Sequence, residues 1–446
     1  MSTFSEQPRL PSLPIPSLSD TLDRYLKAIA PLLSPAQLLL STAAAHAFQQ
    51  GEGAELQRQL MTYAADKASY VEEFWDRAYL CHEDSLVLHL NPYFVLEDDP
   101  TPSNNDQIKR AASLVIGAVQ FHAALAREEL PPDEWRGKPM CMNQYRKLFG
   151  CSRIPQLECS AGGSGVDAIE KFEGSRHIVV MVKGGMYYFD AVWPDGRLAI
   201  SEEGLRRNLR AIMADAESSA GEVRRAGWMH ALTGVNFEHT SVDGHTVLRF
   251  VSEVFASTIM RFASRITTGV KDKFESVPPT VPHDACCRVH DDQPDTQPRE
   301  VPWVLDSFKI RQAMHFAESS PPAAAVQVRL SDLVFQNESR VLEFTGFGKI
   351  TITAHNLSPD AFVQLGLMAA YYQLFGQIVS VYEPVQTKTF LHGRTEAART
   401  MTSEAASFVE TMFNAPSAQL KVNRHSHQAM PSISASAYGE SCLVQV

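Results

Sequence analysis

The sequence predicts an α/β protein, built either of two or three domains or of one large two-lobed α/β unit. Its 446 residues are enough to bury a large core. Hydrophobic residues make up 44% of the chain and charged residues 20%, which is typical of a globular protein. Segments with helical spacing of apolar residues are interspersed with short strand-like runs, and this combination favours the α/β class.

The chain opens with an expected tail, followed by helices. Prolines at positions 8, 11, 14 and 16 fix the backbone and remove hydrogen-bond donors, so residues 1–20 are expected to be extended. From about residue 22 to residue 80, apolar side chains recur at helical spacing. A strand and turn are predicted over 86–96, and another helix over 108–130.

A hairpin and a strand that leads into a helix come next. Residues 177–196, HIVVMVKGGMYYFDAVWPDG, contain an apolar strand, a Gly-Gly turn and an aromatic-rich strand. The stretch GVNFEH, at 234–239, is a further predicted strand. It passes through a polar turn into a helix over 247–266.

The second half of the chain begins after a change of composition. Residues 271–300 are rich in Pro, Asp and Gln and lack apolar periodicity, which indicates a linker. In the block that follows, VLEFTGFGKI (341–350) predicts strand and turn. A long helix is predicted to begin at Ser358, with proline at its first position. The pattern ends near residue 413.

Charge and cysteine content exclude several classes of function. Lys and Arg number 40 against 51 Asp and Glu, a net charge of −11, which argues against nucleic acid and anionic membranes as partners. The seven cysteines have no metal-site spacing and no secretory signal precedes them, so reduced thiols and a cytoplasmic location are expected. The apolar runs are shorter than the roughly 18 to 20 residues of a transmembrane helix. No metal site is predicted.

The stretch VNFEHTSVDG, at 235–244, carries the strongest chemical signal. A histidine is the side chain best suited to remove a proton from a hydroxyl near neutral pH. His239 stands at a predicted strand end, and Asp243 lies four residues on across a turn, within reach of the loop or the ring. Taken alone, the pattern is weak, and an ordinary loop histidine is the simpler interpretation. His245 is a competing candidate, but it enters the helix.

With this segment in place, the chain resembles the choline/carnitine O-acyltransferase family, part of the chloramphenicol acetyltransferase-like superfamily that uses His-x-x-x-Asp/Glu-Gly. The similar segments occur in family order over about residues 20–412. They are YLCHEDSLVLHLNPYF (79–94), GKPMCMNQYRKLFGCSRIP (137–155), RHIVVMVKGGMYYFDAV (176–192), NFEHTSVDG, FGKITITAHNLSPDAFVQLGLMAAYYQLFGQ (347–377) and VYEPVQTKTFLHGRTEAAR (381–399).

The resemblance implies a two-lobed fold in which each lobe is a mixed β-sheet flanked by helices, with the second lobe incomplete and a tunnel between the lobes. It divides the chain into a disordered tail (1–20), a helical segment that packs with the second lobe (21–75), a first acyltransferase lobe with the catalytic histidine (76–270), a linker (271–300), a partial second lobe (301–413) and a disordered tail (414–446).

The family mechanism implies roles for His239 and Asp243. The neutral imidazole of His239 takes the proton of an alcohol, and the alkoxide attacks the thioester carbonyl of acyl-CoA without an acyl-enzyme. Asp243 falls on the acidic position. Coenzyme A is then a substrate rather than a cofactor, and the partners are acyl-CoA and a small hydroxyl acceptor such as carnitine.

Substrate-binding residues carry over from two further motifs. Gly348 and Lys349 match the segment beside pantetheine and phosphate, and Asp360 matches an aspartate near CoA. Lys349 is otherwise a solvated surface lysine and Asp360 an acid in the first turn of a helix. The remaining matches concern the acceptor: Tyr382, Arg394, Thr395 and Tyr79, of which Tyr79 could equally be a core aromatic.

The sequence departs from the family pattern at several positions. Thr353 and Asn356 stand where lysines are expected, which weakens the case for the 3′-phosphate of free CoA and makes an acyl carrier protein a credible donor. Pro384 replaces a serine. An arginine for the carnitine carboxylate and a Ser-Thr-Ser motif have no match in residues 400–446, as a misread splice junction or a short paralogue would produce.

Three functions therefore remain open from the sequence. The first is an O-acyltransferase that moves an acyl group from acyl-CoA to carnitine or a similar small alcohol. The second is transfer of a carrier-protein-bound acyl or polyketide chain to a polyol. The third is a catalytically inactive, truncated family member that keeps His239.

Overall fold

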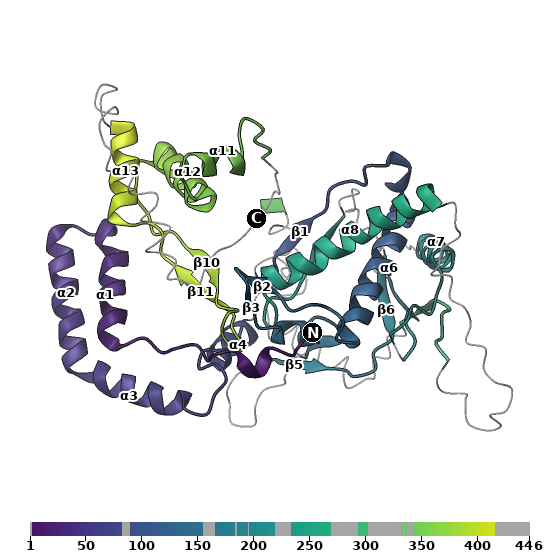
Figure 1. Cartoon of the computed structure of the whole chain (residues 1–446), viewed down its shortest axis with the longest axis horizontal. Helices are drawn as coiled ribbons and strands as arrows, with labels where there is room; N and C mark the ends of the chain where they lie inside the picture. The colour runs from purple at the N-terminus through teal and green to yellow at the C-terminus, as the bar shows by residue number, and fades with distance from the viewer. Residues whose placement is uncertain are drawn as a thin grey trace. The chain divides into compact units, whose positions relative to one another are not determined.

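The structure is a computed structural model of the chain (Figure 1). It describes residues 2–82, 90–154, 166–182, 185–194, 196–218, 233–268, 293–301, 332, 335–336 and 342–414. The chain divides into two compact units. Unit 1 comprises Met1–Phe4, Trp75–Pro131 and Gln144–Ser339, and unit 2 comprises Ser5–Phe74, Pro132–Asn143 and Arg340–Val446.

Small antiparallel sheets and helices make up unit 1. Its elements are β1 (Tyr93–Val95), η3 (Pro102–Asn104), α6 (Gln107–Ala126), β4 (Cys151–Ile154), β5 (Ala168–Lys171), β6 (His177–Val182), β7 (Gly185–Asp190), α7 (Glu202–Ser218), β8 (Gly234–Asn236), α8 (Gly244–Thr268) and β9 (Arg299–Glu300). Two of the boundaries between the units fall inside helical elements, namely α4 (Glu72–Leu80) and η4 (Asn143–Lys147).

The main core of unit 1 lies between the β6–β7–β9 sheet and helices α6 and α7. Along β7 the buried and half-buried residues alternate, as expected for a strand with one face against a core. Tyr187 and Phe189 of β7 pack with Ile116 of α6 and with Leu205 and Ile212 of α7. Helices from two parts of the sequence therefore cover one face of this sheet.

A second cluster of unit 1 forms where β8 leads into α8. Strand β8 pairs antiparallel with β1, and Phe237, Val242, Val247 and Val251 are buried together beside this pair. Helix α8 runs alongside α6 in Figure 1, and Gly117 permits this packing because an added Cβ would lie 3.1 Å from Val254 Cγ1. The strand end before α8 is thus held against an apolar cluster.

Unit 2 is mostly helical. Its elements are η1 (Gln7–Arg9), α1 (Leu18–Ile29), η2 (Ala30–Leu32), α2 (Pro35–Gln50), α3 (Glu52–Ala64), β2 (Glu134–Trp135), β3 (Lys138–Pro139), α11 (Lys349–Ala354), α12 (Pro359–Phe375), β10 (Glu383–Gln386), β11 (Thr395–Ala398) and α13 (Ser403–Asn414). Its core cluster joins Leu365 and Met368 of α12 to Ala405 and Val409 of α13.

A β-hairpin of unit 2 carries the segment that follows Tyr382. Strands β10 and β11 pair from Glu383 opposite Ala398 to Gln386 opposite Thr395. The Lys388 ammonium in the connecting loop lies 2.7 Å from the Asp133 carboxylate, and both side chains are at least 96% buried. At the end of the loop, a Cβ on Gly393 would lie 1.9 Å from the Thr387 carbonyl oxygen, so only glycine fits there.

The predicted α/β class is confirmed, and so are several elements. Helix α6 agrees with the helix expected over 108–130, and β6–β7 with the hairpin over 177–196. Helix α12 is capped as predicted, because the Ser358 hydroxyl accepts a hydrogen bond from the Ala361 amide. Residues 83–89, 183–184, 269–292 and 415–446, on which other predictions fall, lie outside the described residues.

The structure differs from the sequence prediction near the N-terminus. The expected tail contains a 3-10 helix, and α1 already begins at Leu18. Thr3 is fully buried and its hydroxyl donates to the Leu130 carbonyl at 2.7 Å, while Leu10 and Leu13 are 9% exposed. The prolines do prevent long regular elements, but the apolar residues among them still pack against the folded chain.

Three segments also differ from the predicted division of the chain. Residues 349 and 350, the end of the strand and turn predicted over 341–350, instead begin helix α11, and Arg299–Glu300 pair with β7 instead of ending a linker. Pro132–Asn143 belong to unit 2, although they were expected in the first lobe. The buried Lys388–Asp133 ion pair explains why residues 132–143 belong to unit 2. Local sequence patterns cannot predict this pair, because its two residues are 255 positions apart.

None of the helices within the described residues is both long and apolar enough to cross a bilayer. The same residues contain no group of three or more His, Cys, Asp or Glu side chains placed to hold a metal ion.

Candidate active site

The residues between β8 and α8, 237–243, form what we call the catalytic turn, after the role that the sequence predicts for His239. Within it, His239 Nδ1 lies 2.9 Å from the Val242 carbonyl oxygen. A carbonyl oxygen only accepts hydrogen bonds, so Nδ1 carries the hydrogen and Nε2 holds the lone pair of the neutral ring. The His239 side chain is 22% exposed. The turn therefore selects the tautomer in which Nε2 can accept a proton.

Asp243 is brought close to His239 as the spacing predicted, but not in direct hydrogen bond. Its Oδ1 atom lies 3.6 Å from His239 Nδ1, beyond hydrogen-bond distance. The Asp243 side chain is only 5% exposed. A carboxylate at this distance attracts a positive charge that forms on the ring.

Two aromatic rings flank the imidazole. The Tyr79 ring centroid, on α4, is 5.2 Å from the His239 ring, and the Phe237 centroid is 5.9 Å away on the same turn. Tyr79 in turn stacks on Trp75 at 5.4 Å. Tyr79, one of the predicted acceptor-binding residues, therefore lies beside His239 within unit 1.

An ion-paired arginine supports the start of the turn. Arg153 on β4 lies 2.7 Å from Asp167 and 3.6 Å from Glu238, and it donates to the Leu80 carbonyl at 3.1 Å. The Glu238 carboxylate accepts hydrogen bonds from the Thr240 amide, at 2.9 Å, and from the Thr240 hydroxyl. Arg153 thus connects the residue after Tyr79 to the residue before His239.

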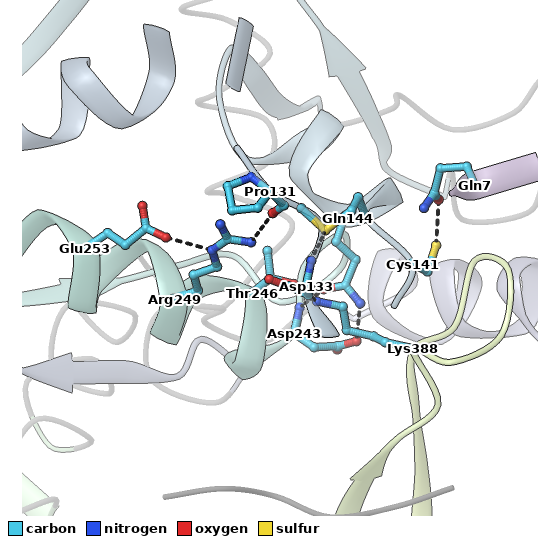
Figure 2. Close-up of polar contacts among 11 residues, drawn as sticks. Gln7, Pro131, Asp133, Cys141, Gln144, Asp243, Thr246, Arg249, Glu253 and Lys388 are labelled. Carbon is cyan, nitrogen blue, oxygen red and sulfur yellow. Dashed lines mark hydrogen bonds and ion pairs between the residues drawn. The ribbon is translucent and has the colours of Figure 1, made fainter. Parts of the chain in front are cut away.

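Gln144 and Thr246 are site residues that the sequence analysis missed. Gln144 is 4% exposed, and its side chain hydrogen bonds to both Asp243 and Thr246 at 2.8 Å (Figure 2). A signal was present, because an Asn-Gln pair interrupts the otherwise apolar run from Met140 to Tyr145. Its partner, however, lies 99 residues further along the chain.

A cavity of about 290 Å³ lies on one side of the catalytic turn. Phe237, Glu238 and Val242 of the turn line it together with Phe149 and Phe250. His239 is not among the described residues that line this cavity. Phe237 is thus both a lining residue of the cavity and a neighbour of the imidazole.

The predicted thioester-binding residues lie at two helix N-termini of unit 2. Gly348 is the N-cap of α11 and Lys349 its first residue, and both are exposed. Asp360 is in the first turn of α12. Thr353, which stands where the family pattern has a lysine, donates its hydroxyl hydrogen to the Lys349 carbonyl at 2.9 Å. Its hydrogen bond is therefore made within its own helix.

The other predicted acceptor-binding residues lie along the β10–β11 hairpin. Tyr382 precedes β10 and is 55% exposed, with the Arg399 guanidinium 5.8 Å from its ring. Thr395 begins β11 opposite Gln386, four residues beyond Tyr382. Arg394 is only 5% exposed. Because Thr395 and Gln386 are directly opposite each other, their side chains point to the same side of the hairpin.

Comparison with known proteins identifies the family. The family model for choline/carnitine O-acyltransferases matches residues 13–233 and 228–435. The chain belongs to the choline/carnitine O-acyltransferase family. Two matched stretches are in keeping with the two lobes expected for this family, and membership supports acyltransferase activity for the chain.

Individual acyltransferases of the family are similar in sequence to this protein over most of the chain. A protein named putative mitochondrial carnitine O-acetyltransferase, from Saccharomyces cerevisiae, is 30% identical over 91% of this chain and 74% of its own length. Human mitochondrial carnitine O-palmitoyltransferase 2 is 26% identical over 89% of this chain and 70% of its own length. A carnitine O-acetyltransferase from Columba livia is 26% identical over 91% of this chain and 72% of its own length. Two of these proteins are described as mitochondrial, so the cytoplasmic location stays a prediction.

Proposed function

We propose that this protein transfers an acyl group from acyl-CoA to the hydroxyl of carnitine or a similar small alcohol, with His239 as general base. The family and its carnitine acyltransferases support the reaction class. The observation that carries the role of His239 is the 2.9 Å contact between its Nδ1 and the Val242 carbonyl. That contact leaves the lone pair on Nε2, the atom that must accept the proton.

In the proposed reaction, Nε2 accepts the hydroxyl proton as the acceptor oxygen forms a bond to the thioester carbonyl carbon. The carbonyl oxygen becomes an oxyanion. When the carbonyl re-forms, the carbon–sulfur bond breaks, and the departing CoA thiolate accepts from Nε2 the proton that came from the acceptor hydroxyl. During the intermediate the ring is positively charged, and the Val242 carbonyl and the Asp243 carboxylate stabilise that charge. No acyl-enzyme is formed.

The substrate contacts belong to the same proposal. Lys349 would contact the phosphate or pantetheine part of CoA as a point charge, and Gly348 and Asp360 lie at neighbouring helix starts. Tyr79, Tyr382 and Thr395 would contact the acceptor through their hydroxyls. Arg394 would support the acceptor-binding hairpin from within, because it is buried.

The test is release of free thiol from acetyl-CoA and from a medium-chain acyl-CoA in the presence of carnitine. The signal is corrected for the seven cysteines of the protein. Of these, Cys141 and Cys151 should react slowly, because burial raises the pKa of both thiols. We expect carnitine-dependent release by the wild-type protein.

His239→Ala should lower kcat by about 10²–10⁴-fold, the usual contribution of a general base. His245→Ala, six residues on, is the matched control and should keep most of the activity. Equal losses in both variants would contradict the assignment of the base. Release that requires no carnitine, or that occurs only with a carrier-bound donor, would contradict the proposed substrates.

A further inference from the structure

The side-chain amide of Gln144 holds both ends of Asp243. Its Oε1 atom accepts a hydrogen bond from the Asp243 backbone N–H at 2.8 Å, and its Nε2 atom donates to Asp243 Oδ2 at 2.8 Å. Oε1 also accepts from the Thr246 hydroxyl at 2.8 Å. These partners fix the orientation of the amide, since a flipped side chain would set its NH₂ against two donors.

Gln144 and His239 hydrogen bond to the same peptide group. The Asp243 N–H and the Val242 carbonyl belong to a single planar peptide unit. Gln144 accepts a hydrogen bond from the nitrogen end of this unit, and His239 Nδ1 donates one to the oxygen end. A hydrogen bond at one end polarises the peptide and strengthens the acceptor at the other.

From this geometry we infer that Gln144 is a positioning residue for His239. It acts through the Val242–Asp243 peptide and through the Asp243 carboxylate, whose orientation it fixes. It keeps the Val242 carbonyl directed at Nδ1 and strengthens that carbonyl as the acceptor when the ring becomes positively charged. The inference rests on the proposed function, in which His239 is the general base.

No other residue type of this size combines the required groups. An ionised glutamate only accepts hydrogen bonds, so it would retain the contacts to the Asp243 N–H and to Thr246 but would oppose the Asp243 carboxylate. Methionine has a similar length and lacks both the donor and the carbonyl acceptor. Gln144→Glu and Gln144→Met therefore separate the charge of the side chain from its shape.

The neighbouring charged groups bear on the pH dependence of such variants. On the catalytic turn, His239 lies 3.6 Å from Asp243, and Glu238 is bonded to Thr240 and lies 3.6 Å from Arg153. Tyr79 of α4 lies against the His239 ring. The charged or titratable groups of η4 are Tyr145, Arg146 and Lys147, and those of α8 between residues 244 and 254 are His245, Arg249 and Glu253. Arg249 bonds to Glu253 and to the Pro131 carbonyl, as Figure 2 shows.

The experiment measures kcat and the KM for carnitine of folded full-length protein between pH 6 and pH 8.5. For Gln144→Met we expect kcat to fall by about tenfold or more, because the Asp243 N–H and carboxylate lose buried partners. The KM for carnitine should change by less than about threefold, since positioning of the base acts on the transition state.

For Gln144→Glu we expect a pH-dependent defect. At low pH the two facing carboxylates can share a proton, which restores a donor between them, and the ratio of variant to wild-type kcat is highest. As pH rises the shared proton is lost, and the ratio should fall by about tenfold or more. A residue that merely fills space would give a ratio independent of pH in correctly folded protein.

Gln120 supplies the matched control. It is a glutamine of the same unit whose side chain also bonds to α8, accepting from the Ser257 hydroxyl at 3.2 Å. Gln120→Glu and Gln120→Met should keep kcat within about twofold of wild type at every pH, because they change no contact of the catalytic turn.

Two outcomes overturn the inference: a Gln144→Met kcat equal to wild type, or a flat Gln144→Glu ratio, in either case with His239→Ala inactive. If His239→Ala retains full activity, the proposed function fails first, and this result is recognisable without any Gln144 variant. If Gln144→Met does not fold, the pH dependence of the kcat ratio of Gln144→Glu to wild type decides alone. That variant can fold at low pH, because its new carboxylate and that of Asp243 can share a proton there.

Discussion

The catalytic turn of unit 1 and the β10–β11 hairpin of unit 2 hold their predicted site residues in different ways. In the turn, His239 bonds to a carbonyl only three residues away and Asp243 is buried beside it. In the hairpin, Tyr382 is 55% exposed, and the fixed group is the buried Lys388–Asp133 ion pair in the loop. In the catalytic turn, contacts between residues close in sequence hold the predicted site residues themselves. In the hairpin, the buried ion pair holds the loop, while Tyr382 at the other end is exposed.

Loss of the Lys388–Asp133 ion pair should lower the stability of the hairpin strongly. Lys388→Met leaves the Asp133 carboxylate buried without the ammonium 2.7 Å away, and such a loss typically destabilises by about 3–5 kcal/mol. Urea unfolding would measure the free energy. Hydrogen exchange should accelerate in peptides from 383–398 while peptides from 177–190 stay protected.

Lys388→Met combined with Asp133→Leu is the control for this prediction. Replacing both partners removes the uncompensated charge, so the double variant should be more stable than the single one. Equal stability of Lys388→Met and the wild-type protein would show that the ion pair does not hold the hairpin.

The next effect tests the exposed side of the comparison. Lys349→Ala removes the cation proposed for the donor, so the KM for acetyl-CoA should rise by about tenfold, as expected for loss of one charged hydrogen bond. The KM for acetyl-pantetheine, which lacks the nucleotide phosphates, serves as the internal comparison. An equal rise for both donors would place the lysine beside pantetheine instead.

A smaller effect concerns helix α12, which carries Asp360. Ser358→Ala removes the hydroxyl that accepts the Ala361 amide at 3.3 Å, and loss of such a cap costs about 1 kcal/mol. Thermal unfolding would show the shift. Ser358→Gly, which costs only a few tenths of a kcal/mol at an N-cap, is the matched variant, and equal losses in the two would argue against the cap.

The smallest effect is a pH dependence in unit 1. Burial and the charge of Lys171 lower the pKa of His122 below its ordinary value. The unfolded chain then binds more protons than the folded one, so this contribution is present above the unfolded pKa of about 6.5 and is lost as pH falls through the lower folded pKa. Urea unfolding of wild type and His122→Leu between pH 7.5 and pH 5 would compare the slopes, and identical slopes would contradict this assignment.

The same comparison explains what the sequence could predict. The proximity of His239 and Asp243 can be predicted because their spacing after a strand is a local feature, and the start of α12 can be predicted because Ser358 and Pro359 mark it. The contacts of Gln144 and Lys388 could not be predicted, because their partners lie 99 and 255 residues away. Residues 1–20 were misjudged since proline content reports backbone limits and not the burial of Leu10 and Leu13.

The Val242 carbonyl holds His239 with the hydrogen on Nδ1 and the lone pair on Nε2, and the proposed mechanism depends on this tautomer. Nitrogen NMR of protein labelled with ¹⁵N-histidine measures this tautomer directly, with His239→Ala assigning the signal and His245→Ala as a control. We predict that the neutral His239 ring carries its hydrogen on Nδ1. A ring with the hydrogen on Nε2 would contradict the account, because that atom could not then accept the acceptor's proton.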